Sequence, residues 1–192
     1  MKLKIHKLKK LRIKNVASKN IILFLTLMLT FSCCNKDDDD NNNETLPPAT
    51  QIGAGTFACY VNGTSYIDTS GGYFNCFYQF VDSEYYFGIS GLDENHSLFS
   101  VIGLASNAST IEDGVQYSLT CNEPQNHYGE VAFKNQLLGA TTCNSSFGTM
   151  IITKLDFTNN IVSGTFEFDI IHPSTGETIQ IRDGRFDTLF TQ

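Results

Sequence analysis

The clearest folding signal in the chain is the stretch Ile161-Val162-Ser163-Gly164-Thr165-Phe166-Glu167-Phe168-Asp169-Ile170-Ile171. Successive side chains of a β-strand point to opposite faces of its sheet, so an extended chain would place apolar residues on one face here. That face would consist of Val162, Gly164, Phe166, Phe168 and Ile170, and the other of Ser163, Thr165, Glu167 and Asp169. The alternation predicts a half-buried strand.

Similar patterns flank this stretch and predict a three-strand meander. Met150 to Phe157 also alternates, and Asn159-Asn160 supplies a hairpin turn before Ile161. The segment from His172 to Gly176 has turn composition and leads into a strand over Thr178 to Phe190. In that strand the inward phase shifts by one residue between Ile181 and Phe186, so a β-bulge is expected at Asp183-Gly184.

Further strands are predicted upstream. Asn62-Gly63 is a strong hairpin signal between Thr56 to Val61 and Ser65 to Asp68. Tyr85 to Leu92 and Leu98 to Leu104 flank a second turn, and Val115, Tyr117 and Leu119 alternate in another strand. We therefore expect residues 53–192 to form one all-β domain, an antiparallel β-sandwich or flattened barrel of about nine strands.

The first 32 residues have the composition of a signal peptide. Basic residues precede the apolar run Ile21 to Phe31, which is shorter than the roughly twenty residues that cross a bilayer as a helix. Eight of the 13 Lys and Arg residues lie before Cys33, so the remaining chain carries five of them against 20 Asp and Glu. This acidic balance argues against nucleic acid as a partner.

Ser32-Cys33 resembles the lipobox of bacterial lipoproteins. The resemblance implies acylation of Cys33 and a membrane as partner through this anchor, while Cys34 is the alternative acylated residue. A soluble secretory leader that ends here is a third interpretation. Lys36-Asp37-Asp38-Asp39-Asp40 resembles the surface-export signal of Bacteroidota lipoproteins and implies an outer-membrane, cell-surface location. A solvated acidic linker is the alternative.

Residues 33–52 are expected to form an acidic, disordered tether, since Asp37 to Gln51 has little to bury. Three motifs in the domain resemble an uncharacterised Bacteroidota surface lipoprotein family. They are Gly55-Thr56-Phe57-Ala58-Cys59-Tyr60-Val61-Asn62-Gly63, Val162-Ser163-Gly164-Thr165-Phe166-Glu167-Phe168 and Ile181-Arg182-Asp183-Gly184-Arg185-Phe186-Asp187. The resemblance implies one β-domain behind a signal peptide and tether, and it assigns no catalytic residue.

Four cysteines lie within the expected domain: Cys59, Cys76, Cys121 and Cys143. An even number in an exported chain indicates two disulfides, with three pairings open. Free buried thiols are one alternative. A zinc site that uses some of Cys121, Glu123, His127 and Cys143 is another, although the chain lacks a C-x-x-C pair.

Signals for catalysis are weak. The chain has no G-x-S-x-G, H-E-x-x-H or phosphate-binding glycine motif. His96, His127 and His172 lie in expected turns or loops, where they are interpreted as solvated surface residues. We therefore predict no catalytic residue, no metal and no cofactor.

Aromatic residues are concentrated between Tyr73 and Phe87. Tyr73, Tyr78, Tyr85 and Tyr86 are candidates for a binding platform, and burial of these rings in the core is the alternative. The leading functional hypothesis is a lipid-anchored surface protein with a non-enzymatic binding or envelope-structural role, its partner a glycan or an envelope protein. A glycan-capture accessory protein is the alternative, followed by a secreted hydrolase.

Overall fold

The computed structural model describes residues 45–71, 75–134, 136–143 and 146–192. These belong to a compact unit that spans Asn43–Gln192. The expected signal peptide, Cys33 and the Lys36 to Asp40 motif lie outside the described residues. The strands are β1 (Thr56–Val61), β2 (Thr64–Ile67), β3 (Asn75–Val81), β4 (Glu84–Leu92), β5 (Phe99–Asn107), β6 (Gln116–Leu119), β7 (Asn126–Phe133), β8 (Gly139–Thr141), β9 (Gly148–Asp156), β10 (Ile161–Ile171) and β11 (Thr178–Leu189).

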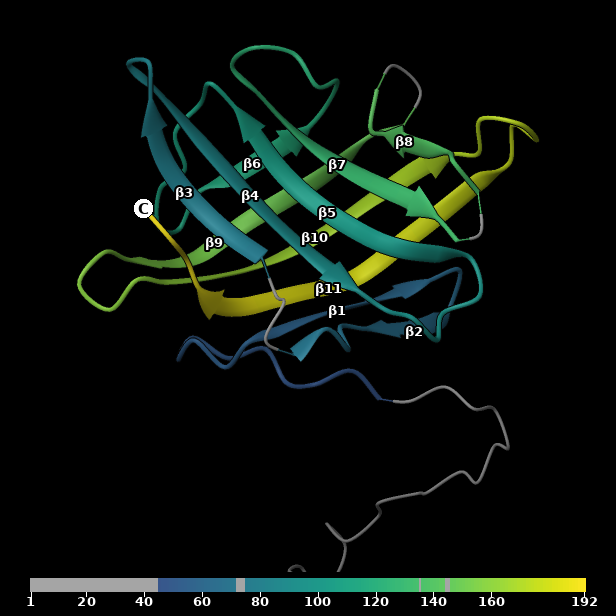
Figure 1. Ribbon diagram of the computed structural model, residues 1–192, viewed down its shortest axis with the longest axis horizontal. Helices are drawn as coiled ribbons and strands as arrows, with labels where there is room; N and C mark the ends of the chain where they lie inside the picture. The colour runs from purple at the N-terminus through teal and green to yellow at the C-terminus, as the bar shows by residue number, and fades with distance from the viewer. Residues whose placement is uncertain (1–44, 72–74, 135, 144–145) are drawn as a thin grey trace, which may run out of the picture. The chain divides into compact units, whose positions relative to one another are not determined.

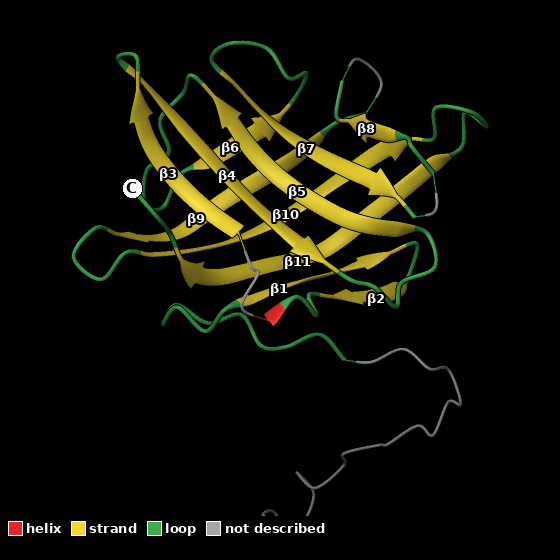
Figure 2. Cartoon of the chain, in the orientation of Figure 1, coloured by secondary structure: helices red, strands yellow, loops and turns green. Residues whose placement is uncertain are grey.

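The all-β prediction is confirmed, and the 11 strands form a single sheet (Figure 2). Its order is β2-β1-β11-β10-β9-β6-β7-β5-β4-β3, with β8 paired to β7. The sheet curls, so that β3, β4, β5 and β7 cross in front of β9, β10 and β11 (Figure 1). The pairs are antiparallel except β6 with β7, which are parallel at Leu119 and His127. The structure thus has two more strands than the sequence suggests, in one mixed sheet.

The C-terminal meander forms as predicted, with β10 paired to both β9 and β11. The bulge in β11 is also confirmed. Phe166 pairs with Gly184 and Phe168 with Ile181, so two residues of β11 lie opposite the single residue Glu167. Asp183 adopts a positive φ of 52° at this point. The extra residue shifts the inward phase and buries both Ile181 and Phe186.

The predicted turns also form. Asn62 and Gly63 have φ of 48° and 82°, the two positive values that a tight hairpin turn of type I′ requires. They join β1 to β2, whose register places Val61 opposite Thr64. Residue Asn160, with φ of 54°, ends the loop between β9 and β10. Short connections therefore fix the order of neighbouring strands.

The core lies between the two halves of the curled sheet. Phe87 of β4 faces Phe186 of β11 with ring centroids 6.3 Å apart. The C-terminal residues after β11 pair with the edge strand β3, because Thr191 exchanges backbone hydrogen bonds with it. Tyr78 N–H donates to Thr191 O at 2.8 Å, and Thr191 N–H donates to Cys76 O at 3.0 Å. This contact satisfies backbone groups on the outer edge of β3.

A lead-in segment, residues 45–55, precedes β1 and is held on β11 by the buried carboxylate of Asp187. This carboxylate accepts hydrogen bonds from the backbone N–H groups of Ile52, Gly53 and Ala54 and from the hydroxyls of Thr50 and Ser163. The prediction of disorder up to Gln51 is therefore wrong for residues 45–51. Composition alone misses this, since one buried acceptor in a distant strand organises the segment.

Candidate binding surfaces

The sequence-predicted aromatic residues separate in the structure. Tyr78 is buried, Tyr85 is 37% exposed and Tyr86 is half-buried, while Tyr73 lies outside the described residues. Tyr86 faces away from the other two because adjacent residues of a strand point to opposite sides. The prediction of a platform that includes Tyr78 as an exposed ring is wrong, since its ring packs inside.

Exposed rings nevertheless gather around Tyr78. Phe80 at the end of β3 is 62% exposed and Phe157 in the loop after β9 is 54% exposed. Ring centroids are 4.8 Å apart for Phe80 and Tyr85, 5.1 Å for Tyr78 and Tyr85, and 5.9 Å for Tyr78 and Phe157. We call Tyr78, Phe80, Tyr85 and Phe157 the aromatic cluster. Three of its rings come from the adjacent strands β3 and β4, and Phe157 comes from a loop far away in the sequence.

Backbone contacts hold the aromatic cluster in place. The Tyr78 hydroxyl accepts a hydrogen bond from Ile111 N–H at 3.3 Å, and Tyr85 O accepts one from Ser109 N–H at 2.9 Å. Burial raises the pKa of Tyr78, so its hydroxyl is neutral at physiological pH. Tyr78 thus forms a fixed base on which Tyr85 stacks and against which Phe157 packs, while Phe80 packs on Tyr85.

A second surface feature is a groove of about 510 Å³ on the outer face of β6, β9, β10 and β11. We call it the outer-face groove. Its floor and sides include Gln116, Thr149, Ile151, Thr165, Glu167 and Asp183. Ala49 of the lead-in segment and Arg185 also line it. A smaller hollow of about 240 Å³ shares Thr149 and Glu167 and adds Phe147 and Arg182.

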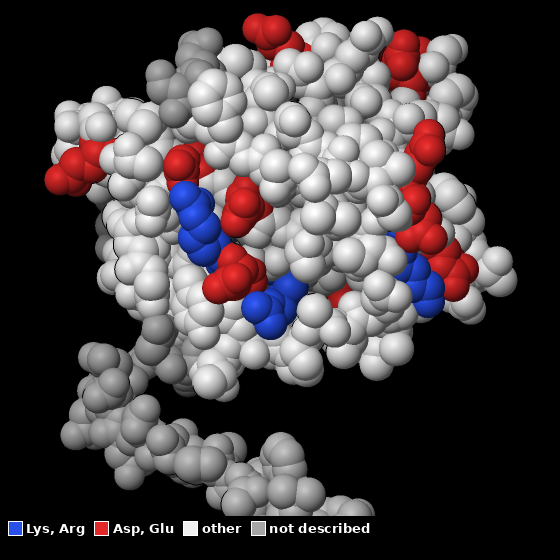
Figure 3. All heavy atoms as spheres, turned by 180° about the vertical axis from the view of Figure 1, so that it is seen from behind, with Lys and Arg blue, Asp and Glu red and all other residues white. Residues whose placement is uncertain are grey.

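Strand register explains how these residues meet. Gln116 pairs with Ile151, Ile151 with Thr165, and Thr165 with Arg185, so the four form one row across the sheet. Thr149 and Glu167 form part of the next row. The bulge in β11 places Asp183 at the end of this row. Figure 3, which views the domain from behind, shows acidic and basic side chains gathered side by side on this face.

The arginines at the outer-face groove make hydrogen bonds within the domain, whereas two of its carboxylates make none in the part of the chain that the structure describes. Arg185 donates to Pro47 O at 3.1 Å and to Asp183 O, while Arg182 donates to Phe168 O, to Ile181 O and to the Asp169 carboxylate. Within the described residues, the carboxylates of Glu167 and Asp183 accept no hydrogen bond. The two charged groups of the groove that lack a hydrogen-bond partner in the described structure are therefore both acceptors.

The histidine interpretation is wrong for two residues. His96 and His127 are buried, and His172 is half-buried. His96 Nδ1 accepts hydrogen bonds from the N–H groups of Leu98 and Phe99, which a neutral ring alone allows. Burial lowers the pKa of His127, whose Nδ1 has no partner in the described structure and whose Nε2 lies 3.3 Å from Ser109 Oγ.

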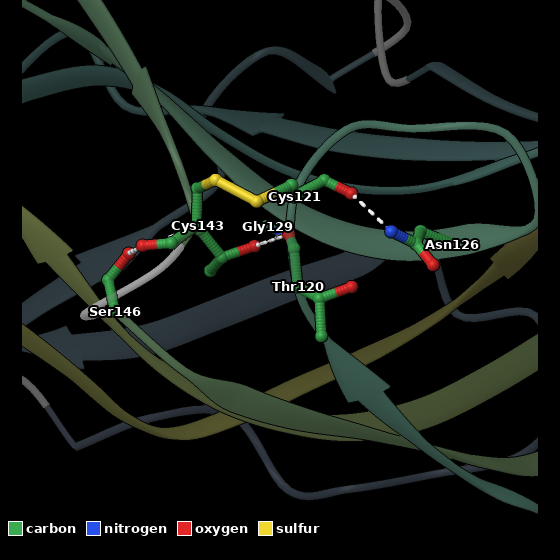
Figure 4. The surroundings of a disulfide bond; sticks show 7 residues. Thr120, Cys121, Asn126, Gly129, Cys143 and Ser146 are labelled. Atoms are coloured by element: carbon green, nitrogen blue, oxygen red, sulfur yellow. Dashed lines mark hydrogen bonds between the residues drawn. A yellow bond between two sulfur atoms is a disulfide. The ribbon is translucent and has the colours of Figure 1, made fainter.

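Cys121 and Cys143 form a disulfide, whereas Cys59 and Cys76 are free and buried. The expectation of two disulfides is therefore wrong by one pair, because Cys59 and Cys76 belong to the core. Figure 4 shows the disulfide beside the hydrogen bond from Asn126 Nδ2 to Cys121 O, at 3.1 Å. Since both sulfurs are bonded, they cannot also ligate zinc, and the described residues contain no cluster of metal ligands.

The described residues contain no helix long and apolar enough to span a bilayer. Comparison with protein-family models, with curated proteins and with solved structures gives no match. Function is therefore inferred from the surfaces described above and from the sequence patterns that precede the domain.

Proposed function

We propose that the protein is a lipid-anchored binding protein of the bacterial cell surface, with no catalytic activity of its own. The observation that carries this proposal is the aromatic cluster. Large apolar rings that stay exposed side by side on a soluble domain are typical of interaction surfaces. The lipobox-like Ser32-Cys33 and the acidic run after it support anchoring and display.

A glycan is the ligand that the aromatic cluster favours. The exposed rings of Phe80, Tyr85 and Phe157 offer flat apolar faces, and the apolar face of a sugar ring stacks on such surfaces. The stacked base of Tyr78 and Tyr85 limits their movement, so little side-chain entropy is lost on binding. An envelope protein is the second candidate, because the same rings would anchor a protein interface.

The test is binding by a soluble Cys33→Ser form of the full chain and by two variants of it. Phe80→Ser combined with Phe157→Ser removes the exposed rings, while Leu137→Ser removes a fully exposed apolar side chain outside the aromatic cluster. We expect a glycan array and crosslinking to isolated envelopes to reveal a ligand that the double variant loses and Leu137→Ser retains. Full binding by the double variant would refute the role of the cluster.

A further inference from the structure

We propose that the outer-face groove is a second binding site, independent of the aromatic cluster, and that it takes a neutral oligosaccharide. None of the four cluster residues lines the groove. Its volume of about 510 Å³ lies within the range of small-molecule sites in proteins. The groove needs no rearrangement to form, because hydrogen-bonded strands make its floor.

The wall that the lead-in segment adds to the groove is held in place by hydrogen bonds, as the strands of the floor are. Ala49 reaches it from the lead-in segment, which Arg185 holds through Pro47 O and Asp187 holds through the Thr50 hydroxyl at 2.6 Å. Such preorganisation lowers the entropic cost of binding. The four strands beneath the groove are about 4.8 Å apart, so it extends about 14 Å across the sheet. A short oligosaccharide that lies across the strands matches a groove of that length.

The chemistry of the lining favours a polyol. Gln116, Thr149 and Thr165 supply an amide and two hydroxyls, which both donate and accept hydrogen bonds. The carboxylates of Glu167 and Asp183 add acceptors that have no partner in the described structure. Adjacent hydroxyls of a sugar are donors that a carboxylate can bind in pairs. Phe147, which is 64% exposed in the neighbouring hollow, adds a ring face for stacking.

Charge narrows the ligand class further. After Cys33 the chain has five Lys and Arg residues against 20 Asp and Glu, so anionic polysaccharides are repelled. The two arginines beside the groove are already bonded to main-chain carbonyl groups. A basic peptide would find two free carboxylates but also the positive charge of Arg185. A neutral sugar chain has hydroxyls for the polar residues of the lining and apolar ring faces for Ile151.

The experiment uses the full chain with Cys33→Ser and a panel of neutral tri- to hexasaccharides of glucose, xylose, mannose, galactose and N-acetylglucosamine. Calorimetry should find at least one binder. Glu167→Ala and Thr165→Val should each weaken that binder about tenfold, as loss of a hydrogen bond to a charged or buried partner does. Glu177→Ala removes the same charge from an exposed turn outside the groove and should change affinity less than twofold.

Three results would overturn the proposal: no binder in the panel, equal affinity of wild type and the groove variants, or binding of hexalysine that outcompetes every sugar and disappears as salt is raised. The Phe80→Ser and Phe157→Ser variant separates this site from the proposed function, because it should bind the groove ligand normally. Cleavage of the bound sugar, measured by mass spectrometry, would support the groove site and refute the non-enzymatic function.

Discussion

The carboxylate of Asp187 in the last strand accepts a 2.6 Å hydrogen bond from the hydroxyl of Thr50, which lies 137 residues earlier in the chain. Through this bond and three more from the backbone N–H groups of Ile52, Gly53 and Ala54, the last strand holds the segment that would lead from the membrane anchor. A fifth bond to the same carboxylate comes from Ser163 of β10. Any force on the tether would therefore enter the domain at the sheet's C-terminal meander.

Asp187→Ala should destabilise the domain strongly, because five donors would lose their acceptor at a buried position. We expect a loss of about 3 kcal/mol in the free energy of unfolding, measured by urea denaturation. Asp183→Asn is the control, since Asp183 is exposed in the same strand and Asn tolerates its positive φ. Equal stability of both variants would contradict the role of Asp187.

Protonation of Asp187 at low pH should also remove the stability that its carboxylate provides. Burial alone would raise the pKa of Asp187, but the hydrogen bonds that it accepts outweigh burial and hold the pKa at about 2. A carboxyl whose pKa is lower in the folded than in the unfolded state stabilises the fold above the unfolded value, about 3.9. Stability should therefore fall between about pH 4 and pH 2, and this part of the fall should vanish in Asp187→Asn.

Because His96 and His127 are buried, we expect stability to begin to fall at a higher pH than the range in which Asp187 titrates. Burial lowers the pKa of His96 and of His127, so the unfolded chain binds more protons near its own value of about 6.5. The free energy of unfolding should consequently decrease as pH falls below about 6.5. His127→Phe removes one of these groups and should give a flatter profile in that range. A profile as steep as that of wild type would show that His127 titrates normally.

The disulfide between Cys121 and Cys143 should stabilise the folded domain. Cys121 and Cys143 are 22 residues apart, and closing a loop of that size contributes about 3 kcal/mol in the chain-entropy description. The Cys121→Ser, Cys143→Ser variant should lose that amount. In a Cys33→Ser, Cys34→Ser background, thiol titration under denaturing conditions should find two thiols, from Cys59 and Cys76. Four thiols, or none, would contradict this assignment.

Several features were predictable from sequence because they are local. β10 alternates between buried and more exposed residues from Gly164 to Ile171, and the phase shift in β11 requires an extra residue at Asp183. The alternation predicted for Ser163 is wrong, because its hydroxyl is buried where it donates to Asp187. β3 escaped prediction because its aromatic residues occupy both faces, with Phe77 on one and Tyr78 on the other. β7 also alternates, but inward-facing His127 and Gly129 conceal its apolar pattern.

The candidate binding surfaces were harder to predict from the sequence. The aromatic run predicted a platform in the right segment, yet Phe157 joins it only through tertiary packing. The outer-face groove depends on the register that sets Thr165 beside Ile151 and Arg185, and no local pattern specifies such a register. Disulfide pairing is likewise a property of the folded chain, since it requires the two Cα atoms to approach closely.

Surface display makes a separate prediction. Replacement of Lys36 and Asp37 to Asp40 by Ala should leave the protein lipidated but retain it inside the outer membrane, where proteases added to intact cells do not reach it. Replacement of Asn41-Asn42-Asn43 by Ala is the control and should leave the protein sensitive. Protease sensitivity of both variants would indicate that the acidic run is only a solvated linker.

Anchoring through Cys33 is decided by the mass of the mature N-terminal peptide from a bacterial host that processes lipoproteins. We predict a chain that begins at Cys33 and carries fatty acyl groups on that residue, and Cys33→Ser should abolish both the acylation and the membrane association. An uncleaved leader, or a trimmed N-terminus without fatty acid, would contradict a lipid-anchored binding protein.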